Sequence, residues 1–302
     1  MQYSCVVRGL ASLSLLVLLG GIAACGAGTA SPAGKINVVA AENFWGSVAE
    51  QLGGTRVSVQ SVVSDPNADP HEYESSANDA RAFADANLVI LNGAGYDDWG
   101  QKLVDANPAA GREVLDVATG LGKKAGDNPH FWYDPEAVVL TADRITADYK
   151  SIDSKDATYF DQMRSDLTAA LQPFEDEVGG IKQKYSGVAI GSTESIFVYM
   201  AAALGLRLTT PAAFMNAISE GIDPPASAVV QFQDQVSGNQ IRALVYNSQT
   251  ATAVTTDIKV LAASHRIPTV AVTETLQPQD ATFQDWQLAQ LRSLEAALSA
   301  TS

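Results

Sequence analysis

Short apolar runs alternate with amphipathic stretches along the chain from residue 35 onward. Continuous apolar runs of this length are typical of strands covered on both faces. They predict strands over 36–41, 87–91, 114–115, 187–191, 243–246 and 269–272, and alternation of apolar and polar residues predicts another over 57–63. Helical spacing predicts helices over 44–52, 80–86, 99–104, 196–204, 226–236, 252–263 and 283–298. Strands separated by helices require crossover connections, so the pattern predicts an α/β fold with parallel sheets.

The predicted strands fall into two groups. Residues 35–134 form an expected N-terminal α/β lobe and residues 186–302 a C-terminal one, with an all-helical segment over 135–185 between them. The sequence Asp134-Pro135-Glu136 favours a helix start, because an aspartate caps the first turn and proline suits the first helical position. We therefore expect two lobes joined by helix.

The second helix of this segment is predicted from about Lys155 to Lys184, where apolar residues recur three and four positions apart. Roughly thirty residues at about 1.5 Å each extend about 45 Å, long enough to connect both lobes. Such a connecting helix resists bending more than paired loops do. Pro173 and Gly179-Gly180 interrupt it, which predicts a kink or an early stop.

The beginning of the chain has the pattern of an export signal. Arg8 supplies a positive charge and residues 10–19 an apolar stretch that is short for a membrane span. Ile22-Ala-Ala-Cys25 resembles a bacterial lipobox, in which the cysteine carries the lipid. We expect a signal peptide over 1–24 and a lipidated flexible tether over 25–34; a plain secretory signal is the alternative.

The cysteine content and the net charge limit the kinds of site and partner that the protein can have. Cys5 leaves with the signal peptide and Cys25 is the expected lipid carrier, so disulfides, thiolate metal sites and cysteine nucleophiles are excluded. Removing the signal peptide also removes Arg8 and no acid, so 34 acids face 18 bases and the formal charge is −16. This charge argues against nucleic acid and anionic lipid headgroups as partners.

The chain has three histidines, and two of them follow a proline. His71 lies in Asp69-Pro-His-Glu-Tyr-Glu74, and His130 follows Pro129 just before the helical segment. The fixed φ of proline stiffens the preceding backbone, which suits a metal ligand, although a single Pro-His pair is more often a turn. His265 is at a helix C-terminus, where a basic side chain is expected for structural reasons.

Two acids follow strands of the C-terminal lobe. Glu194 comes after 187–191 and Glu274 after 269–272. Ligands of open α/β sheets bind beyond the carboxyl ends of the strands, and two carboxylates with two neutral imidazoles would cancel the charge of a divalent cation. Taken singly, each glutamate also suits a helix N-terminus. Other acids in reach of such a cation are Glu42, Glu72, Glu74 and Asp134.

Four segments together resemble the zinc/manganese substrate-binding lipoproteins of bacterial metal ABC transporters, in the helical-backbone metal receptor superfamily. They are Asp69-Pro-His-Glu-Tyr-Glu74, Pro129-His-Phe-Trp-Tyr-Asp-Pro135, Gly191-Ser-Thr-Glu-Ser-Ile-Phe197 and Val272-Thr-Glu-Thr-Leu276. The similarity covers residues 36–298. It implies two lobes, a long connecting helix and a metal cleft between the lobes.

The resemblance also implies the site. Its ligands would be His71, His130, Glu194 and Glu274, with Cys25 lipidated. The fourth position is usually Asp, so the longer Glu274 leaves monodentate and bidentate binding open. The cargo would be one Mn²⁺ or Zn²⁺ ion, with Fe²⁺ a further candidate: carboxylates favour manganese, whereas the Irving–Williams order favours zinc.

The expected function is capture of a divalent transition metal outside the cytoplasm, by a lipid-anchored monomer, for delivery to an ABC permease in the cytoplasmic membrane. Four protein ligands leave no open position for a reactive water, so we expect no enzymatic activity. A surface adhesin or structural lipoprotein is one alternative. A lipid-anchored metallohydrolase is another, although the chain has no His-Glu-x-x-His motif and no Gly-x-Ser-x-Gly elbow.

Overall fold

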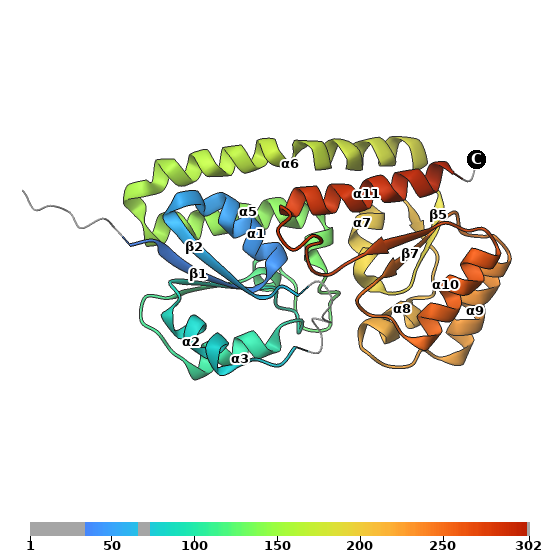
Figure 1. The fold of residues 1–302 in the computed structure, drawn as a ribbon, viewed down its shortest axis with the longest axis horizontal. Helices are drawn as coiled ribbons and strands as arrows, with labels where there is room; N and C mark the ends of the chain where they lie inside the picture. Colours follow the sequence, from blue (N-terminus) through green and yellow to red (C-terminus); the bar gives the residue numbers. More distant parts are fainter. Residues whose placement is uncertain (1–33, 66–72, 301–302) are drawn as a thin grey trace, which may run out of the picture. The chain divides into compact units, whose positions relative to one another are not determined.

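The computed structural model describes residues 34–65 and 73–300 (Figure 1). Residues Lys35–Ser302 belong to one compact unit. The predicted signal peptide, the lipidation site Cys25 and the predicted ligand His71 lie outside the described residues.

The first sheet contains four parallel strands in the order β2-β1-β3-β4. The strands are β1 (Ile36–Glu42), β2 (Val57–Val63), β3 (Leu88–Leu91) and β4 (Glu113–Asp116). The helical elements along this half are α1 (Asn43–Gly53), η1 (Gly54–Arg56), α2 (Ala77–Asp85), α3 (Asp98–Ala106), α4 (Val117–Gly120) and η3 (Phe131–Tyr133). Each crossover passes through a helix, which is what parallel neighbours require.

The second sheet repeats this arrangement with the order β6-β5-β7-β8, again all parallel. Its strands are β5 (Ala189–Ser192), β6 (Arg207–Leu208), β7 (Leu244–Asn247) and β8 (Thr269–Val272). Its helices are η5 (Ser195–Phe197), α7 (Val198–Ala203), α8 (Ala212–Ser219), α9 (Ala226–Ser237) and α10 (Ala253–Ser264). The predicted α/β class with two parallel sheets is confirmed. The pattern did not predict β6 or α8; a two-residue strand is too short to show any periodicity.

Two long helices lead along the chain from the first sheet to the second, and a third follows the last strand. They are α5 (Pro135–Ile152), α6 (Ala157–Tyr185) and α11 (Phe283–Ser299), with η4 (Ser154–Asp156) between the first two. The predicted start of α5 is confirmed, because the Asp134 side chain accepts a hydrogen bond of 3.0 Å from the Glu136 amide. Figure 1 shows α6 running past both sheets and α11 lying beside the second half of α6, and the two helices are in contact.

The helix α6 continues to Tyr185, so the early stop predicted at Pro173 is wrong. Pro173 is exposed, whereas Leu171 and Phe174 beside it are buried in the core. The apolar face of the helix therefore stays packed on either side of the proline. Tertiary packing of this kind supplies most of the stability of a helix in a protein and outweighs the missing hydrogen bond.

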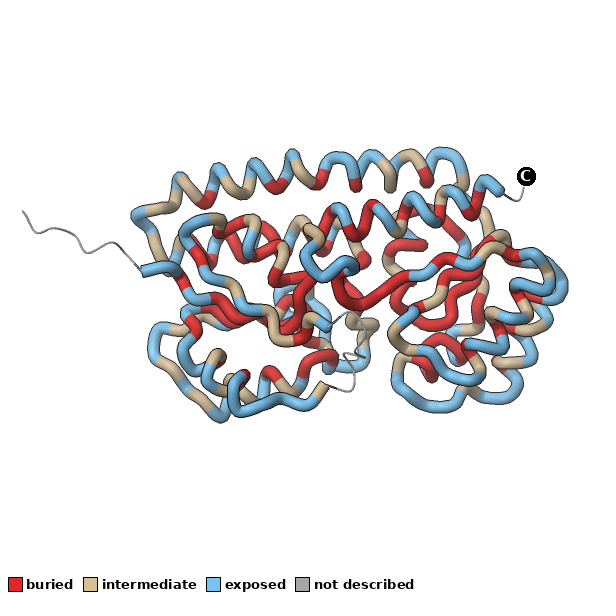
Figure 2. Tube along the Cα trace, in the orientation of Figure 1, coloured by how far each residue is buried: buried red, intermediate tan, exposed pale blue. Residues whose placement is uncertain are grey.

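One hydrophobic core extends through both halves of the compact unit. It contains Val38 of β1, Trp45 of α1, Leu171 of α6, Ile190 of β5 and Leu291 of α11. Figure 2 shows buried stretches in both sheets and on the inner sides of these helices. Both sheets are thus attached to the same helices. Of the residues described, no helix combines the length and apolar character needed to span a membrane.

Candidate metal centre

Three of the predicted ligands meet in the interior. His130, Glu194 and Glu274 each offer one ligand atom, and these atoms lie within 4.8 Å of one another. All three residues have an exposed fraction of 0%. They are separated by as many as 144 positions in the sequence, so only the fold brings them together.

The strand ends explain this meeting. Glu194 is two residues beyond the end of β5, and Glu274 is two residues beyond the end of β8. The strands are parallel, so their carboxyl ends lie along the same edge of the second sheet. His130 precedes η3, in the segment that leads from the first sheet into α5. The site is therefore built from the edge of one sheet and a loop that follows the other.

The His130 ring is oriented by Asn128. The amide oxygen of Asn128 accepts a hydrogen bond of 3.1 Å from the His130 backbone N–H and lies 2.6 Å from Nδ1 of the ring. The Asn128 amide nitrogen donates to the carbonyl of Ser195 at 2.8 Å, which fixes which end is the oxygen. Nδ1 must therefore carry the proton, and Nε2 keeps the lone pair that a metal needs.

Glu194 is held at both carboxylate oxygens. Asn247 Nδ2 donates to Oε1 at 2.6 Å, and the Ser219 hydroxyl donates to Oε2 at 3.1 Å. The Ser192 hydroxyl donates to the Glu194 backbone carbonyl at 2.7 Å, which closes the turn after β5. The carboxylate therefore has a defined orientation.

Glu274 is held in the same way. Its Oε1 accepts a hydrogen bond of 2.7 Å from Asn247 Nδ2, and its Oε2 accepts one from the hydroxyl of Tyr96. Its backbone N–H donates to Gln249 Oε1 at 2.6 Å. Tyr96 comes from the loop after β3, so a side chain of the first half orients an acid of the second half.

The segment that carries Glu274 is attached to the first half of the chain on both sides. The Tyr133 hydroxyl donates to the Thr273 carbonyl at 2.8 Å, and the Leu276 amide donates to Asn43 Oδ1 at 3.2 Å. Farther along, the Phe283 amide donates to the Ser47 hydroxyl at 3.0 Å. These bonds hold Glu274 and His130 within one framework.

Burial dominates the electrostatics around the site. The pKa of Glu42, at the end of β1, is raised well above its usual value by burial, and then by the nearby acids Asp97 and Glu274. Burial and Glu274 also raise the pKa of Tyr96, so this phenol stays protonated and remains a donor. Burial raises the pKa of Asp97 to about 6, although two backbone amides donate to it. Negative charge is therefore costly here without a cation.

The donor set fits a divalent transition metal. Two like charges within 4.8 Å repel by about 3 kcal/mol at an effective dielectric constant of 20, and a bound cation would reverse this term. One imidazole nitrogen and two carboxylates suit Mn²⁺, Fe²⁺ and Zn²⁺. A second, neutral imidazole would add a fourth ligand and leave the charge of the ion balanced by the two carboxylates. The predicted fourth ligand, His71, precedes the described Tyr73 by two positions.

The other acids considered from the sequence occupy different places. Glu74 is exposed, and Asp134 caps α5. Glu42 is buried, with an exposed fraction of 1%, but it is not in the group of three that meet within 4.8 Å. Glu72 lies outside the described residues.

Four contributors were not predicted from the sequence: Asn247, Tyr96, Ser219 and Asn128. Asn247 is the last residue of β7, so it follows an apolar run just as the two acids do. Its position at the end of a strand was the feature of the sequence from which a role of Asn247 at the site could have been predicted. Asn128 is two residues before His130, a spacing at which a side chain reaches the next backbone amides.

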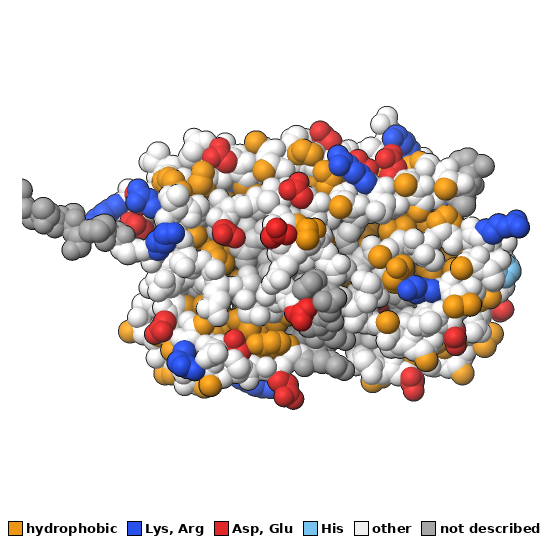
Figure 3. All heavy atoms as spheres, in the orientation of Figure 1, with side chains coloured by type: hydrophobic (Ala, Val, Ile, Leu, Met, Phe, Trp, Pro, Cys, Tyr) orange, Lys and Arg blue, Asp and Glu red, His pale blue; other side chains and the backbone are white. Residues whose placement is uncertain are grey.

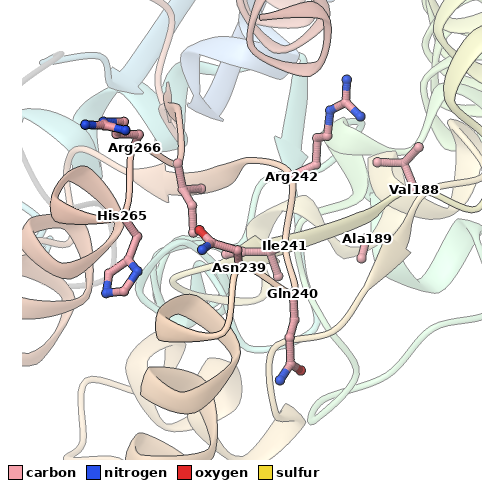
Figure 4. A pocket seen from close by; sticks show the side chains of 9 residues that line it. Val188, Ala189, Asn239, Gln240, Ile241, Arg242, His265 and Arg266 are labelled. Carbon is pink, nitrogen blue, oxygen red and sulfur yellow. The ribbon is translucent and has the colours of Figure 1, made fainter. Parts of the chain in front are cut away.

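A cavity of about 400 Å³ lies elsewhere in the molecule. It is found where Val188, Asn239, Arg242 and His265 approach one another, near the amino ends of β5, β7 and β8. In Figure 4 the side chains of Arg242, His265 and Arg266 point in different directions and do not converge on one point. His265 therefore lies at the edge of the second sheet opposite to the three buried candidate ligands.

Two parallel sheets connected by long helices, with buried Glu side chains beyond the strand ends and a buried His in a loop beside them, define the class of two-lobed metal receptors. The chain belongs to the ZnuA family, described as "Zinc-uptake complex component A periplasmic", which it matches over residues 38–297. The predicted family is confirmed.

Curated relatives carry related names. The chain is 27% identical over 242 residues to "Metal ABC transporter substrate-binding lipoprotein FimA" of Streptococcus parasanguinis, covering 72% of this chain and 76% of that one. It is 28% identical over 220 residues to "Manganese-binding lipoprotein MntA" of Halalkalibacterium halodurans, covering 69% and 71%. The first relative is thus named as a component of a metal transporter and the second as a manganese-binding lipoprotein.

Solved structures share the fold. The Mn-bound periplasmic metal binding protein from Candidatus Liberibacter asiaticus superimposes with a TM-score of 0.72 at 16% sequence identity. The match covers 86% of this chain and 98% of the other. At this identity the likeness concerns the architecture alone.

Proposed function

We propose that this protein is the substrate-binding component of a metal ABC transporter: it binds one divalent transition metal ion outside the cytoplasm and delivers it to a membrane permease. The observation that carries the proposal is the buried meeting of His130, Glu194 and Glu274. A set of buried acids with an imidazole oriented through Asn128 has little use without a cation. The cargo is Mn²⁺ or Zn²⁺, with Fe²⁺ a further candidate.

His71 is the fourth ligand in this proposal. It supplies a second neutral imidazole, so that two carboxylates and two imidazoles balance the charge of one divalent ion. With four protein ligands the ion has no open position for a reactive water, which suits transport and not catalysis. The protein therefore acts as a receptor and not as an enzyme.

The location follows from the N-terminal sequence and the relatives. Residues 1–24 are removed as a signal peptide, Cys25 carries the lipid, and residues 25–34 tether a monomer formed by the two lobes and the helical segment 135–185. Relatives named as lipoproteins support this anchoring. With residues 1–24 removed the formal charge is −16, and this charge and the scattered Lys and Arg side chains on the face in Figure 3 fit a partner other than nucleic acid.

Metal content tests the proposal directly. Protein without an affinity tag is purified with no added metal, analysed for manganese, iron and zinc by mass spectrometry, stripped with a chelator, and titrated with each ion in competition. We expect one ion per chain and one binding site. The variant His265→Ala, changed at the opposite edge of the second sheet, is the control and retains this stoichiometry. Wild-type protein that takes up none of the three ions would refute the proposal.

A second experiment tests the anchor. In cells, wild-type protein is expected in the membrane fraction and to incorporate labelled fatty acid. Cys25→Ala is expected to lose both properties and yet to bind the same metal, because residue 25 lies in the tether and outside Lys35–Ser302. Fatty-acid labelling of the variant at the wild-type level would refute lipidation at Cys25.

A further inference from the structure

Asn247 lies between the two carboxylates of the candidate site. Its single amide nitrogen donates to Glu194 Oε1 at 2.6 Å and to Glu274 Oε1 at 2.7 Å. A primary amide has two N–H groups, so one side chain can make both bonds. Asn247 has an exposed fraction of 3%, so water does not compete freely for these donors.

The backbone determines which end of the Asn247 amide points toward the acids. The Gln249 amide donates to Asn247 Oδ1 at 2.9 Å, which identifies the oxygen. The nitrogen therefore points to Glu194 and Glu274. Gln249 also accepts from the Glu274 backbone amide through Oε1 at 2.6 Å, so the turn after β7 holds both the side chain and the backbone of one acid.

The second oxygen of each carboxylate has a donor of its own. Ser219 donates to Glu194 Oε2 and Tyr96 to Glu274 Oε2. Each of these two bonds restrains one acid. Asn247 differs from them because it bonds both acids at once, and it does so without adding a charge.

We propose that Asn247 is a positioning residue that sets the separation of Glu194 and Glu274 and the oxygen that each presents to a divalent cation. This inference rests on the proposed function. Two neighbouring carboxylates repel, and a shared donor offsets the repulsion before the ion arrives. An N–H bond also occupies one lone pair of each Oε1, which limits bidentate binding, the mode available to larger ions. Asn247 therefore controls both affinity and coordination number.

The substitution Asn247→Leu tests this, because leucine has a similar volume and no donor. The matched control is Thr146→Val, which removes a buried 2.8 Å hydrogen bond inside α5, away from the site. Mn²⁺ titration is expected to give an affinity about tenfold or more weaker for Asn247→Leu, as for other residues that orient metal ligands, and unchanged for the control. The visible spectrum of bound Co²⁺ is expected to shift in Asn247→Leu alone, because that spectrum reports coordination number.

The results separate the inference from the proposed function. Wild-type protein that binds no Mn²⁺ or Co²⁺ would remove the proposed function itself. Wild-type binding together with an unchanged affinity and an unchanged Co²⁺ spectrum in folded Asn247→Leu would overturn only the role of Asn247. A purely structural role would lower the melting temperature and leave the Co²⁺ spectrum as it is.

A double-mutant comparison covers the case in which Asn247→Leu fails to fold. Glu194→Gln removes one of the two charges, so the repulsion that Asn247 offsets is absent in that background. Asn247→Leu is therefore expected to lower the melting temperature of the metal-free protein much less in the Glu194→Gln background, or to recover folding there. An equal fall in melting temperature in both backgrounds would contradict the bridging role of Asn247.

Discussion

Replacing His130 by alanine is the sharpest test of the candidate centre. The ring is fully buried, and its centroid lies 5.1 Å from that of Trp132 and 6.2 Å from that of Tyr96. The change removes the Nε2 lone pair and leaves a cavity beside two aromatic rings. It should therefore weaken metal binding and also destabilise the metal-free protein, and the assay must separate these two effects.

The part of the unfolding free energy that depends on bound metal can be calculated, because metal binding is coupled to folding. At a metal concentration of about 100 times the Kd, a ligand that binds only the folded state adds about 2.7 kcal/mol to the free energy of unfolding. Loss of a ligand should weaken affinity by about tenfold or more, which leaves about 1.4 kcal/mol or less at the same concentration. For a chain of this size about 1 kcal/mol corresponds to about 2–4 °C in Tm. Metal should therefore raise the Tm of the wild type by about 5–11 °C and that of His130→Ala by at most half as much.

The assay is the melting temperature with and without metal, read as a difference. The absolute Tm of metal-free His130→Ala is expected to fall as well, because truncating a buried side chain costs about 2–4 kcal/mol. His265→Ala is the matched control: it also removes an imidazole, but one at the opposite edge of the second sheet. A metal-induced shift in His130→Ala equal to that of wild type would refute the assignment of His130 as a ligand.

Three further predictions concern neighbouring features. Metal binding should change the tryptophan fluorescence, and Trp132→Phe should remove most of that change, because the Trp132 ring lies beside His130; a full response in the variant would contradict this. Asp97 has a pKa raised to about 6 by burial, so the folded protein holds a proton that the unfolded chain releases, and stability should fall from pH 4 to pH 6 by about 2 kcal/mol. Denaturant titrations should show this slope flattened in Asp97→Asn, and an unaltered slope would mean that Asp97 is not its origin. Pro173→Ala should raise the free energy of unfolding by about 1–2 kcal/mol, because α6 continues through an exposed proline and regains a backbone hydrogen bond; no gain in urea denaturation would contradict it.

The sequence predicted those parts of the fold that depend on local periodicity. The parallel strands and α6 follow from apolar spacing, because a strand buried on both faces and an amphipathic helix each leave a repeated signal. The persistence of α6 through Pro173 could not be predicted locally. It depends on the packing of Leu171 and Phe174 against elements far away in the sequence.

The placement of Glu194 and Glu274 at one edge of a sheet was predictable, because parallel strands have their carboxyl ends at the same edge, whereas the full set of candidate ligands came from the family resemblance. The hydrogen-bond partners of these ligands were not predictable. The contact from Tyr96 to Glu274 joins positions 178 residues apart, and the spacing along the chain carries no information about it. Asn247 stands at a strand end like the acids, but a neutral amide shows no charge pattern that would single it out.

The network around the acids bears on selectivity among metals. For a fixed set of nitrogen and oxygen ligands, affinity rises from manganese to zinc, so side-chain identity alone would favour zinc. A preference for manganese has to come from geometry, through the number of oxygens offered and the space between them. In this protein every carboxylate oxygen of Glu194 and Glu274 already has a donor, and the segment around Glu274 is bonded to the first half of the chain through Tyr133 and Asn43. Selectivity should therefore respond to changes in these donors even when every ligand is kept, and competition between Mn²⁺ and Zn²⁺ in such variants measures it.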